Sequence, residues 1–322
     1  MAKLATSRAK RARTSAATRA TGEPAAVEIA GVPVTHPERV LWEEQGVTKR
    51  ELAEYYVAVA DRILPHVVGR PLTLVRCPAG AKKTCFFQKH AWAGLSGFIH
   101  RQSLGESEAD VLSVRDIRGV VAFAQAGVLE IHPWGARLSD LDRPDRVVFD
   151  FDPGEGVAWS AVVAAAREMR ERLDALKLQN FVKTTGGKGL HVVVPLTPEA
   201  GWDQAKRFSK ALSDAMVADA PERYTTTSVK SEREGKIFID YLRNTRGATA
   251  VAPYSTRARP GAPVSVPLAW DELSDDAAQT RFTVETLPRR LAAGPDPWAG
   301  FFAVEQTLPA APTRRRRPKK PG

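Results

Sequence analysis

Short apolar runs that stop at glycine, proline or polar clusters predict the strands of this chain. They are expected at residues 71–76, 147–152, 181–185, 190–196 and 236–242. Longer stretches with apolar residues at helical spacing predict helices at residues 48–66, 159–178 and 202–219. The first helix begins with Thr48 and Glu51, which have the spacing of a capping box. Because strands and helices mix without a regular strand–helix–strand alternation, we expect an α+β (mixed α/β) body and not a Rossmann domain.

Weaker patterns lie between these segments. Residues 34–42 are typical of an extended segment followed by a turn, and residues 111–132 hold one or two apolar runs. Residues 268–304 have poor periodicity and predict a peripheral helical region. No internal repeat is visible, so the 322 residues are expected to form one large unit or two packed subdomains.

The candidate chemistry centres on residues 147–156, with the sequence Val-Val-Phe-Asp-Phe-Asp-Pro-Gly-Glu-Gly. This pattern places Asp150 and Asp152 near the end of a buried strand, on the same face and about 6–7 Å apart. Two such charges are costly unless a positive charge lies between them, and Mg²⁺ or Mn²⁺ suits hard oxygen ligands. A pair of solvated aspartates at a strand end is the alternative.

Asp240 ends another apolar run in the same way. Together with the two aspartates of the first strand it would form a three-carboxylate cage for two metal ions. Such a pair of ions can activate a 3′-hydroxyl and neutralise a leaving pyrophosphate. Taken alone, Asp240 is more typical of an ordinary strand end.

Two further clusters are candidates for anion binding. Residues 184–191, Thr-Thr-Gly-Gly-Lys-Gly-Leu-His, form a glycine-rich turn in which backbone N–H groups can approach an anion and Lys188 adds a positive charge. The order of a Walker A loop is absent, and a hairpin with a solvated lysine is the alternative. Arg257 and Arg259 lie two residues apart and can reach one phosphate chain, although isolated pairs of this kind are usually surface residues.

The positive charge of the chain is concentrated at its two ends. The sequence has 47 Lys and Arg against 37 Asp and Glu, a formal net charge of +10. Residues 1–22 and 313–322 each carry six basic residues and no acid, which leaves 35 basic against 37 acidic residues elsewhere. We expect residues 1–26 and 306–322 to be disordered basic tails. Such arms commonly add salt-sensitive affinity for nucleic acid, and solubilising ends are an equal alternative.

Cysteine spacing and hydropathy indicate the redox state and the cellular location to be expected. Cys77 and Cys85 lack the spacing of a zinc site or a disulfide framework, so we expect reduced thiols. No apolar run approaches the roughly 18 residues that a membrane span needs, and no secretory apolar region follows the N-terminus. The sequence therefore predicts a soluble, cytoplasmic protein without a membrane partner.

Two other functions fit parts of this pattern. A phosphatase of the haloacid-dehalogenase type also has a strand-borne Asp-x-Asp, but its pattern requires Thr or Val where Pro153 stands. Its late acidic pair is also missing, since Asp275 and Asp276 lie in a polar stretch. A DNA-end-binding module without catalysis is the other alternative. Dependence of activity on Mn²⁺ or Mg²⁺ and on nucleoside triphosphates separates all three.

The motifs, taken together, resemble the polymerase domain of bacterial DNA ligase D, a branch of the archaeo-eukaryotic primase superfamily that acts in non-homologous end joining. Four of them carry the resemblance, in the order of the family: residues 149–156, 185–191, 238–240 and 252–259. The resemblance extends over residues 34–302. It implies that residues 27–305 form a primase-like catalytic core of two packed mixed or antiparallel β-sheets flanked by helices.

The resemblance implies a role for each candidate at the nucleotide site. Three residues would be the catalytic metal ligands for two Mn²⁺ or Mg²⁺ ions: Asp150, Asp152 and Asp240. Six would bind a ribo- or deoxyribonucleoside triphosphate: Thr185, Lys188, His191, His132, Arg257 and Arg259. The two arginines match positions on the phosphates, and His132 matches a histidine near the sugar.

DNA contacts are implied for five other residues. Phe86 and Phe87 match aromatic residues that stack against base and template. Arg233 matches an arginine that helps to order the primer end and the metal. Arg39 and Lys49 match a basic pair that grips the 5′-phosphate of the downstream strand at a gap or break.

The sequence thus predicts a nucleotidyltransferase that adds nucleotides, preferentially ribonucleotides, to DNA 3′-ends and fills short gaps during non-homologous end joining. Its expected partners are DNA with a 5′-phosphorylated gap or broken end, nucleoside triphosphates, Ku and a DNA ligase. The chain lacks the Lys-x-Asp-Gly signature of a ligase. A stand-alone polymerase and a domain of a longer protein are both consistent with that absence.

Overall fold

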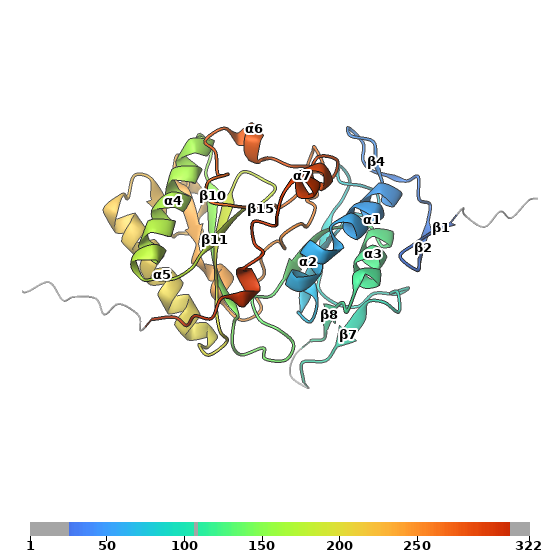
Figure 1. Cartoon of the computed structure of the whole chain (residues 1–322), viewed down its shortest axis with the longest axis horizontal. Coiled ribbons are helices and arrows are strands. Elements are labelled where there is room, and N and C mark those ends of the chain that lie inside the picture. Colours follow the sequence, from blue (N-terminus) through green and yellow to red (C-terminus); the bar gives the residue numbers. More distant parts are fainter. Residues whose placement is uncertain (1–25, 106–108, 310–322) are drawn as a thin grey trace, which may run out of the picture.

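The computed structural model describes residues 26–105 and 109–309, and its centre is a six-stranded sheet (Figure 1). In spatial order its strands are β13 (Tyr224–Thr225), β14 (Ile237–Asp240), β10 (Arg146–Pro153), β12 (Leu190–Pro195), β11 (Phe181–Thr184) and β15 (Pro267–Leu268). Neighbouring strands are antiparallel except β13 and β14, which are parallel. The predicted mixed α/β fold class is confirmed.

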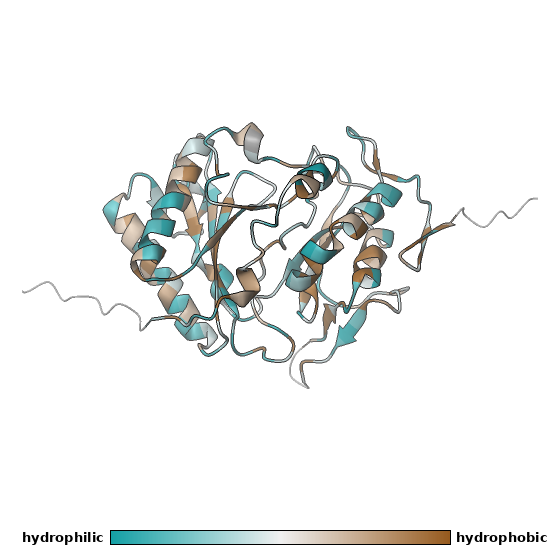
Figure 2. Ribbon diagram, in the orientation of Figure 1, coloured by the Kyte–Doolittle hydropathy of each residue, from teal (hydrophilic) through white to brown (hydrophobic). Residues whose placement is uncertain are grey.

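Two long helices cover one face of this sheet. α4 (Trp159–Ala175) packs on β10 and β12, and α5 (Trp202–Asp219) packs on β10 and β13. Every second side chain of β10 points toward them, and Val147, Phe149 and Phe151 are fully buried. Figure 2 shows these strands as largely hydrophobic, while hydrophilic and hydrophobic stretches alternate along both helices. Apolar burial on this side therefore fixes which residues face the other side.

The opposite face of the sheet carries the polar residues of the same strands. In β10 the polar residues on this face are Arg146, Asp150 and Asp152, and Val148 lies between them. Only a small apolar core forms here, in which Val148 and Val193 pack against Trp298. The remaining area of this face is available for polar chemistry.

The N-terminal half contains a second sheet, which has five strands. Its path is β6 (Phe86–Gln88), β5 (Leu72–Arg76), β8 (Val111–Ser113) and β7 (His100–Gln102), and β9 (Val128–Pro133) also pairs with β5. The helices of this half are α1 (Lys49–Ala58), α2 (Ala60–Val67) and α3 (Ile117–Gln125). Two hairpins precede them: β1 (Ala26–Ile29) with β2 (Val32–Thr35), and β3 (Val40–Trp42) with β4 (Val47–Thr48).

The C-terminal third of the described chain consists mostly of short elements. They are the 3₁₀ turns η1 (Lys230–Glu232), η2 (Tyr241–Asn244) and η3 (Phe301–Ala303), and the helices α6 (Ala277–Thr280) and α7 (Leu287–Ala293). In Figure 1, the chain after α7 runs down between the two halves and then along the central-sheet half. The packing continues past residue 305, because Leu308 is buried and the Gln306 side chain donates to the carbonyls of Gln179 and Pro195.

The start of α1 agrees with the capping box in the sequence. The Thr48 side chain accepts from the Glu51 N–H at 3.2 Å, and a Glu51 carboxylate oxygen accepts from the Thr48 N–H at 2.7 Å. The helix is not continuous to residue 66, however. Val59 leaves helical geometry, with φ −106° and ψ 16°, and separates α1 from α2.

The expectation of reduced thiols is wrong, because Cys77 and Cys85 form a disulfide. The two residues flank the loop between β5 and β6, which pair antiparallel. This pairing brings the two Cα atoms to 4.4 Å. The hairpin thus places the two cysteines within disulfide distance, which their spacing in the sequence did not reveal.

Two other expectations concern the ends of the chain and the membrane. The basic tails predicted at residues 1–26 and 306–322 lie almost entirely outside the described residues. Among the helices of the described ranges, none combines the length and apolar character needed to cross a membrane.

Candidate active site

Four titratable side chains form a row across the central sheet. Lys183 of β11, His191 of β12, Asp150 of β10 and Asp240 of β14 are register partners in that order. Because register partners point to the same face, the row lies opposite α4 and α5. Each of the four is at most 9% exposed. The fold thus gathers two carboxylates, an imidazole and an amine away from bulk water.

Arg243 supplies the positive charge between the two buried carboxylates. Its Nε atom lies 3.1 Å from one oxygen of Asp150 and 3.1 Å from one oxygen of Asp240. The His191 Nε2 atom is 3.3 Å from the other Asp150 oxygen. Burial raises the pKa of Asp150, but His191 and Arg243 outweigh it and hold that pKa well below its usual range. Burial and the Asp150 charge raise the pKa of Asp240, with Arg243 opposing them.

Burial lowers the pKa of both basic side chains in the other half of the row. Burial and the nearby Lys183 lower the pKa of His191 to about 4. Burial and then Arg257 lower the pKa of Lys183 well below its ordinary value. The Lys183 Nζ atom donates to the Ser265 hydroxyl at 2.7 Å. The imidazole therefore acts as a neutral hydrogen-bonding partner of Asp150 near neutral pH.

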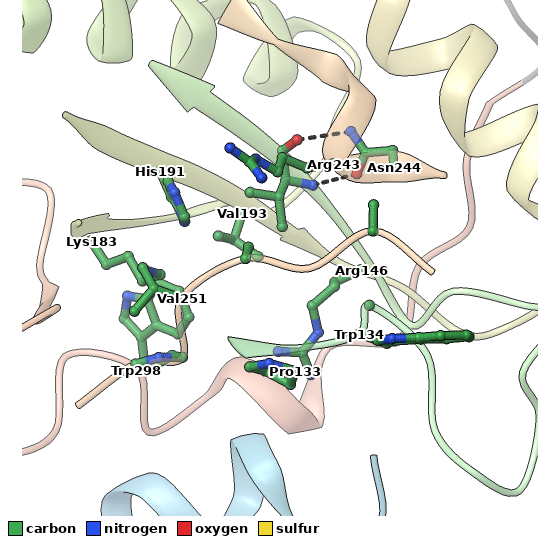
Figure 3. A pocket seen from close by; sticks show the side chains of 15 residues that line it. Pro133, Trp134, Arg146, Lys183, His191, Val193, Arg243, Asn244, Val251 and Trp298 are labelled. Atoms are coloured by element: carbon green, nitrogen blue, oxygen red, sulfur yellow. Dashed lines mark hydrogen bonds between the residues drawn. The ribbon is translucent and has the colours of Figure 1, made fainter. Parts of the chain in front are cut away.

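Asn244 fixes the position of Arg243. Its side chain accepts from the Val148 N–H and donates to the Val148 carbonyl, both at 2.8 Å (Figure 3). β14 does not pair with this part of β10, because their register begins at Asp150. The Asn244 amide thus continues the hydrogen-bond ladder and holds η2 against β10. Arg243, one residue earlier, is thereby placed beside the carboxylates.

Asp152 lies at the open end of β10, where its side chain is 60% exposed. The Arg233 Nη1 atom is 3.7 Å from it, and the same guanidinium lies 3.7 Å from the centre of the Phe238 ring. A Cβ on Gly154 would lie 1.8 Å from the Arg233 carbonyl oxygen, so only glycine allows this close approach. Burial and the Asp150 charge raise the pKa of Asp152. The structure thus brings Asp152 and Arg233 together.

The glycine-rich turn is closed by the Thr185 hydroxyl. This group donates to the Gly189 carbonyl at 3.1 Å and accepts from the Gly187 N–H at 3.3 Å. Gly186 has a φ of +66°, and a Cβ there would lie 2.7 Å from the Arg257 Cγ atom. The Arg257 Nη1 atom donates to the Thr185 carbonyl. These glycines therefore allow the turn to pack against the arginine.

A cavity of about 210 Å³ gathers most of the predicted nucleotide and metal residues. Its walls include eight of them: His132, Asp150, Asp152, Thr185, Lys188, His191, Arg257 and Arg259. Arg243 also lines it, so two carboxylates face four cationic side chains. This charge pattern suits an anionic ligand that carries cations of its own, such as a metal-bound triphosphate.

The predicted stacking residues lie near this cavity on the N-terminal sheet. Phe86 and Phe87 of β6 are 42% and 69% exposed. The Phe87 ring lies 6.4 Å from the ring of His132, which lines the cavity. Solvent-exposed aromatic residues beside an anion site are suited to stacking on bases.

Arg39 and Lys49 are adjacent to each other but lie outside the cavity lining. The Lys49 N–H donates to the Arg39 carbonyl at 2.8 Å. The Arg39 side chain is exposed, whereas Lys49 is 5% exposed and its Nζ atom donates to the Thr35 carbonyl at 2.9 Å. Burial and the Arg39 charge lower the pKa of Lys49 to about 8.

Three residues of the site were missed by sequence reasoning: Lys183, Arg243 and Glu130. Glu130 contacts both His132 and Arg257. Its position two residues before His132 on a strand was the available signal, since such residues share a face. Lys183 and Arg243 had no comparable signal, because their importance depends on strand register and on the η2 turn.

A narrower cavity of about 30 Å³, wide enough for one or two water molecules, adjoins the first. It shares His191 and Arg243 with the larger cavity, and Arg146, Lys183 and Trp298 also line it. Figure 3 shows Lys183 and His191 on neighbouring strands above Trp298. The back of the charged row therefore adjoins a small cavity lined by both polar and apolar side chains.

The donor set fits hard divalent cations. Asp150, Asp152 and Asp240 offer carboxylate oxygens, which Mg²⁺ and Mn²⁺ prefer. Arg243 already places a positive charge between two of them. Within residues 26–105 and 109–309, no three His, Cys, Asp or Glu side chains converge closely enough to hold a single ion in the present arrangement.

A mixed sheet that presents strand-borne carboxylates beside a cation-lined cavity suits a metal-dependent nucleotidyltransferase of the polymerase class. Residues 48–298 match the family described as LigD, primase-polymerase domain, and the chain belongs to this family. It is therefore an enzyme, and the use of metal and nucleotide is general to polymerase domains of this family. The alternative of a DNA-binding module without catalysis is not supported.

Relatives in three bacteria are similar to the chain. The multifunctional non-homologous end joining protein LigD of Pseudomonas aeruginosa is 41% identical over 290 residues, which cover 89% of this chain and 34% of that protein. The bifunctional LigD of Bacillus subtilis is 28% identical, covering 89% of this chain and 46% of that protein. A solved structure, the polymerase domain from Mycobacterium tuberculosis ligase D in complex with DNA, superposes with a TM-score of 0.78 at 31% identity, covering 84% of this chain and 98% of that one. The chain thus spans less than half the length of these two LigD proteins.

Proposed function

We propose that this enzyme adds nucleotides, preferentially ribonucleotides, to DNA 3′-ends and fills short gaps during non-homologous end joining. The observation that carries the proposal is the cavity in which Asp150 and Asp152 face four cationic side chains. Two relatives support the cellular role, because both are named as end joining proteins. The structural relative bound to DNA supports the choice of nucleic acid.

The proposed reaction joins a primer 3′-oxygen to the α-phosphorus of a nucleoside triphosphate and releases pyrophosphate. Lys188, Arg257 and Arg259 bind the phosphate oxygens and stabilise the charge of the leaving pyrophosphate. Thr185 shapes the turn beneath that chain through its bonds to the loop backbone. Mn²⁺ or Mg²⁺, when held by Asp150, Asp152 and Asp240, lowers the pKa of the primer hydroxyl and neutralises the phosphates.

His191 and Arg233 contact the carboxylates of Asp150 and Asp152 and orient them for metal binding. The His191 Nε2 atom lies beside Asp150 and keeps that carboxylate in one orientation. Arg233 approaches Asp152 at the open end of the strand, where the primer terminus would lie. His132 would contact the nucleotide sugar from the opposite wall of the cavity.

The DNA would lie across both halves of the molecule. Phe86 and Phe87 would stack against the base and template, since both are exposed beside the cavity. Arg39 and Lys49 would bind the 5′-phosphate of the downstream strand. Ku and a DNA ligase are the proposed protein partners, and the nucleoid of the cytoplasm is the proposed site of action.

Primer extension on a one-nucleotide gap tests this proposal. The downstream strand carries either a 5′-phosphate or a 5′-hydroxyl, and ATP or dATP is supplied opposite dT with Mn²⁺ or Mg²⁺. We expect metal-dependent addition that is faster with ATP and faster on the phosphorylated gap. Absence of any extension with either metal would contradict the proposed activity, and equal rates with ATP and dATP would contradict the nucleotide preference.

A further inference from the structure

Glu130 is a buried carboxylate on which three nucleotide-site groups converge. One oxygen accepts a hydrogen bond from the His132 Nε2 atom at 2.8 Å, and the Arg257 Nε atom lies 3.0 Å from the same oxygen. The other oxygen accepts from the Ala258 N–H at 2.9 Å. Glu130 is 6% exposed and lies on β9, in the N-terminal sheet. It therefore links that sheet to the arginine segment that lines the cavity.

This environment keeps Glu130 ionised. Burial alone would raise its pKa, but the His132 hydrogen bond and the Arg257 charge lower it to about 2. A carboxylate in this state only accepts hydrogen bonds. Each group that forms a hydrogen bond with the Glu130 carboxylate must therefore be the donor.

The consequence for His132 concerns which ring nitrogen carries hydrogen. Its Nε2 atom faces the Glu130 carboxylate and so must be the protonated nitrogen. Burial lowers the pKa of His132, although Glu130 opposes this, so the ring is neutral near pH 7. The Nδ1 atom then holds a lone pair and can only accept. The 2′-hydroxyl of ribose can donate to it, whereas C2′ of deoxyribose carries no hydroxyl and offers no hydrogen-bond donor.

Glu130 also affects the orientation of the Arg257 guanidinium. Glu130 holds the Nε side of the guanidinium, and the Thr185 carbonyl accepts from the Nη1 atom. The side chain is only 13% exposed, and it lines the cavity. Held from two sides, the guanidinium is oriented before a phosphate arrives, which lowers the entropy lost on binding.

We propose that Glu130 is a positioning residue that couples recognition of the ribose hydroxyl by His132 to binding of the triphosphate by Arg257. The inference rests on the proposed nucleotidyltransferase function and adds a residue that selects ribonucleotides. Glu130 itself touches neither the sugar nor the phosphates. It acts by fixing the tautomer of one partner and the orientation of the other.

The test is single-nucleotide extension by Glu130→Gln protein, with kcat and KM measured separately for ATP and dATP. A glutamine retains the shape but removes the charge that pairs with Arg257 and leaves one acceptor oxygen for the His132 and Ala258 donors. Its amide N–H also favours the opposite His132 tautomer. We expect KM to rise for both nucleotides through Arg257. We also expect the ratio of kcat/KM for ATP over dATP to fall at least about tenfold, through loss of the acceptor on His132.

Two companion variants separate positioning from a general structural effect. Glu54→Gln makes the same chemical change on the exposed side of α1 and should leave both KM values and the ratio unchanged. In a His132→Phe background, Glu130→Gln should still raise KM but should no longer change the ratio. If Glu130→Gln protein melts below the assay temperature, Glu130→Asp replaces it, because the shorter side chain keeps the charge but withdraws the carboxylate from His132 and Arg257. The ratio should again fall and both KM values should again rise.

The outcomes distinguish the inference from the function on which it rests. Wild-type extension with an unchanged ATP:dATP ratio in Glu130→Gln overturns the inference and leaves the polymerase function standing. A ratio that His132→Phe does not alter overturns it as well. Absence of extension by the wild-type protein overturns both.

Discussion

At the scale of single residues, the site depends on charges that compensate one another at short range. Asp150 and Asp240 face each other on adjacent strands, and their repulsion would be costly at such low exposure. Arg243 contacts both, and although burial lowers its pKa, the two carboxylates raise it above the ordinary value. The three side chains therefore form one electrostatic unit. A divalent cation that binds the carboxylates must displace this arginine or share the carboxylates with it.

Lys49 offers a prediction on pH dependence. Its pKa is lowered to about 8, so the ammonium is present below pH 8 and is lost as the pH rises through that value. If the ammonium binds the 5′-phosphate, the preference for 5′-phosphorylated over 5′-hydroxyl gaps should fall about tenfold between pH 7 and pH 9. Fluorescence anisotropy with the two gapped duplexes measures this preference.

The matched control for this prediction is Lys49→Arg, which remains charged throughout that range. Its preference for the phosphorylated gap should change little with pH. An equal decline in the wild type and in Lys49→Arg would show that another group titrates and would remove Lys49 from the proposed phosphate site.

At the scale of elements, the strand β10 shows what the sequence could and could not predict. Its Asp-x-Asp pattern and the Pro-Gly exit indicated a strand with two carboxylates on one face, and β10 has this form. The pairing of Asp150 with His191 and Asp240 was not predictable, because register depends on contacts between distant segments. The same limit applies to Lys183, which joins the row only through the pairing of β11 with β12.

The sequence pattern also did not predict the end of α1 or the disulfide between Cys77 and Cys85. The capping box located the start of α1, since it depends on residues three apart. The break at Val59 has no proline or glycine to mark it. The disulfide between Cys77 and Cys85 depends on the hairpin of β5 and β6 and so required the fold.

Asn244 supports a prediction on the element that follows β14. It is 2% exposed and makes two hydrogen bonds to the Val148 backbone. Asn244→Ala leaves a buried N–H and a buried carbonyl without these partners, so we expect a loss of roughly 2–4 kcal/mol in the free energy of unfolding. Urea denaturation measures this loss.

Asn180→Ala is the control for that measurement, because Asn180 is only half-buried and its amide donates to Asp174 and to a nearby carbonyl. Its cost should be about 1 kcal/mol or less. A loss for Asn244→Ala no larger than that of the control would contradict the view that Asn244 continues the strand ladder.

At the scale of the whole molecule, the two halves are joined by a buried ionic contact. Arg70 immediately precedes the N-terminal sheet and is fully buried, and Asp145 immediately precedes β10. The Arg70 Nη1 atom donates to Asp145 at 2.9 Å, and Arg137 and Arg146 also approach this carboxylate, at 3.3 Å and 3.0 Å. Removing the carboxylate would leave Arg70 buried without its partner. The contact therefore ties the segment before β5 to the start of β10.

The Arg70–Asp145 contact predicts how the free energy of unfolding depends on pH. Burial raises the pKa of Asp145, but Arg146 and Arg70 outweigh it and hold the pKa well below its usual range. Its contribution is therefore present above the unfolded-state pKa of about 3.9 and is lost as the pH falls through the folded-state value. We expect Asp145→Asn to lose roughly 3 kcal/mol of unfolding free energy at pH 7 and less at pH 3.

Denaturant unfolding at both pH values checks this expectation, with Asp142→Asn as the control. The Asp142 side chain is 86% exposed and should contribute about 0.5 kcal/mol or less at either pH. A cost for Asp145→Asn that stays constant from pH 7 to pH 3 would contradict the assigned linkage.

We propose that the carboxylates of β10 are essential for nucleotide addition. Asp150→Ala/Asp152→Ala protein should lose at least about a thousandfold in the rate of single-nucleotide extension on a gapped duplex, because the charges that would hold the metals are gone. Asp140→Ala/Asp142→Ala is a matched control, since these aspartates have the same spacing on an exposed loop. We expect this control to extend the primer at the wild-type rate. Extension by Asp150→Ala/Asp152→Ala protein at the rate of the control would contradict the account.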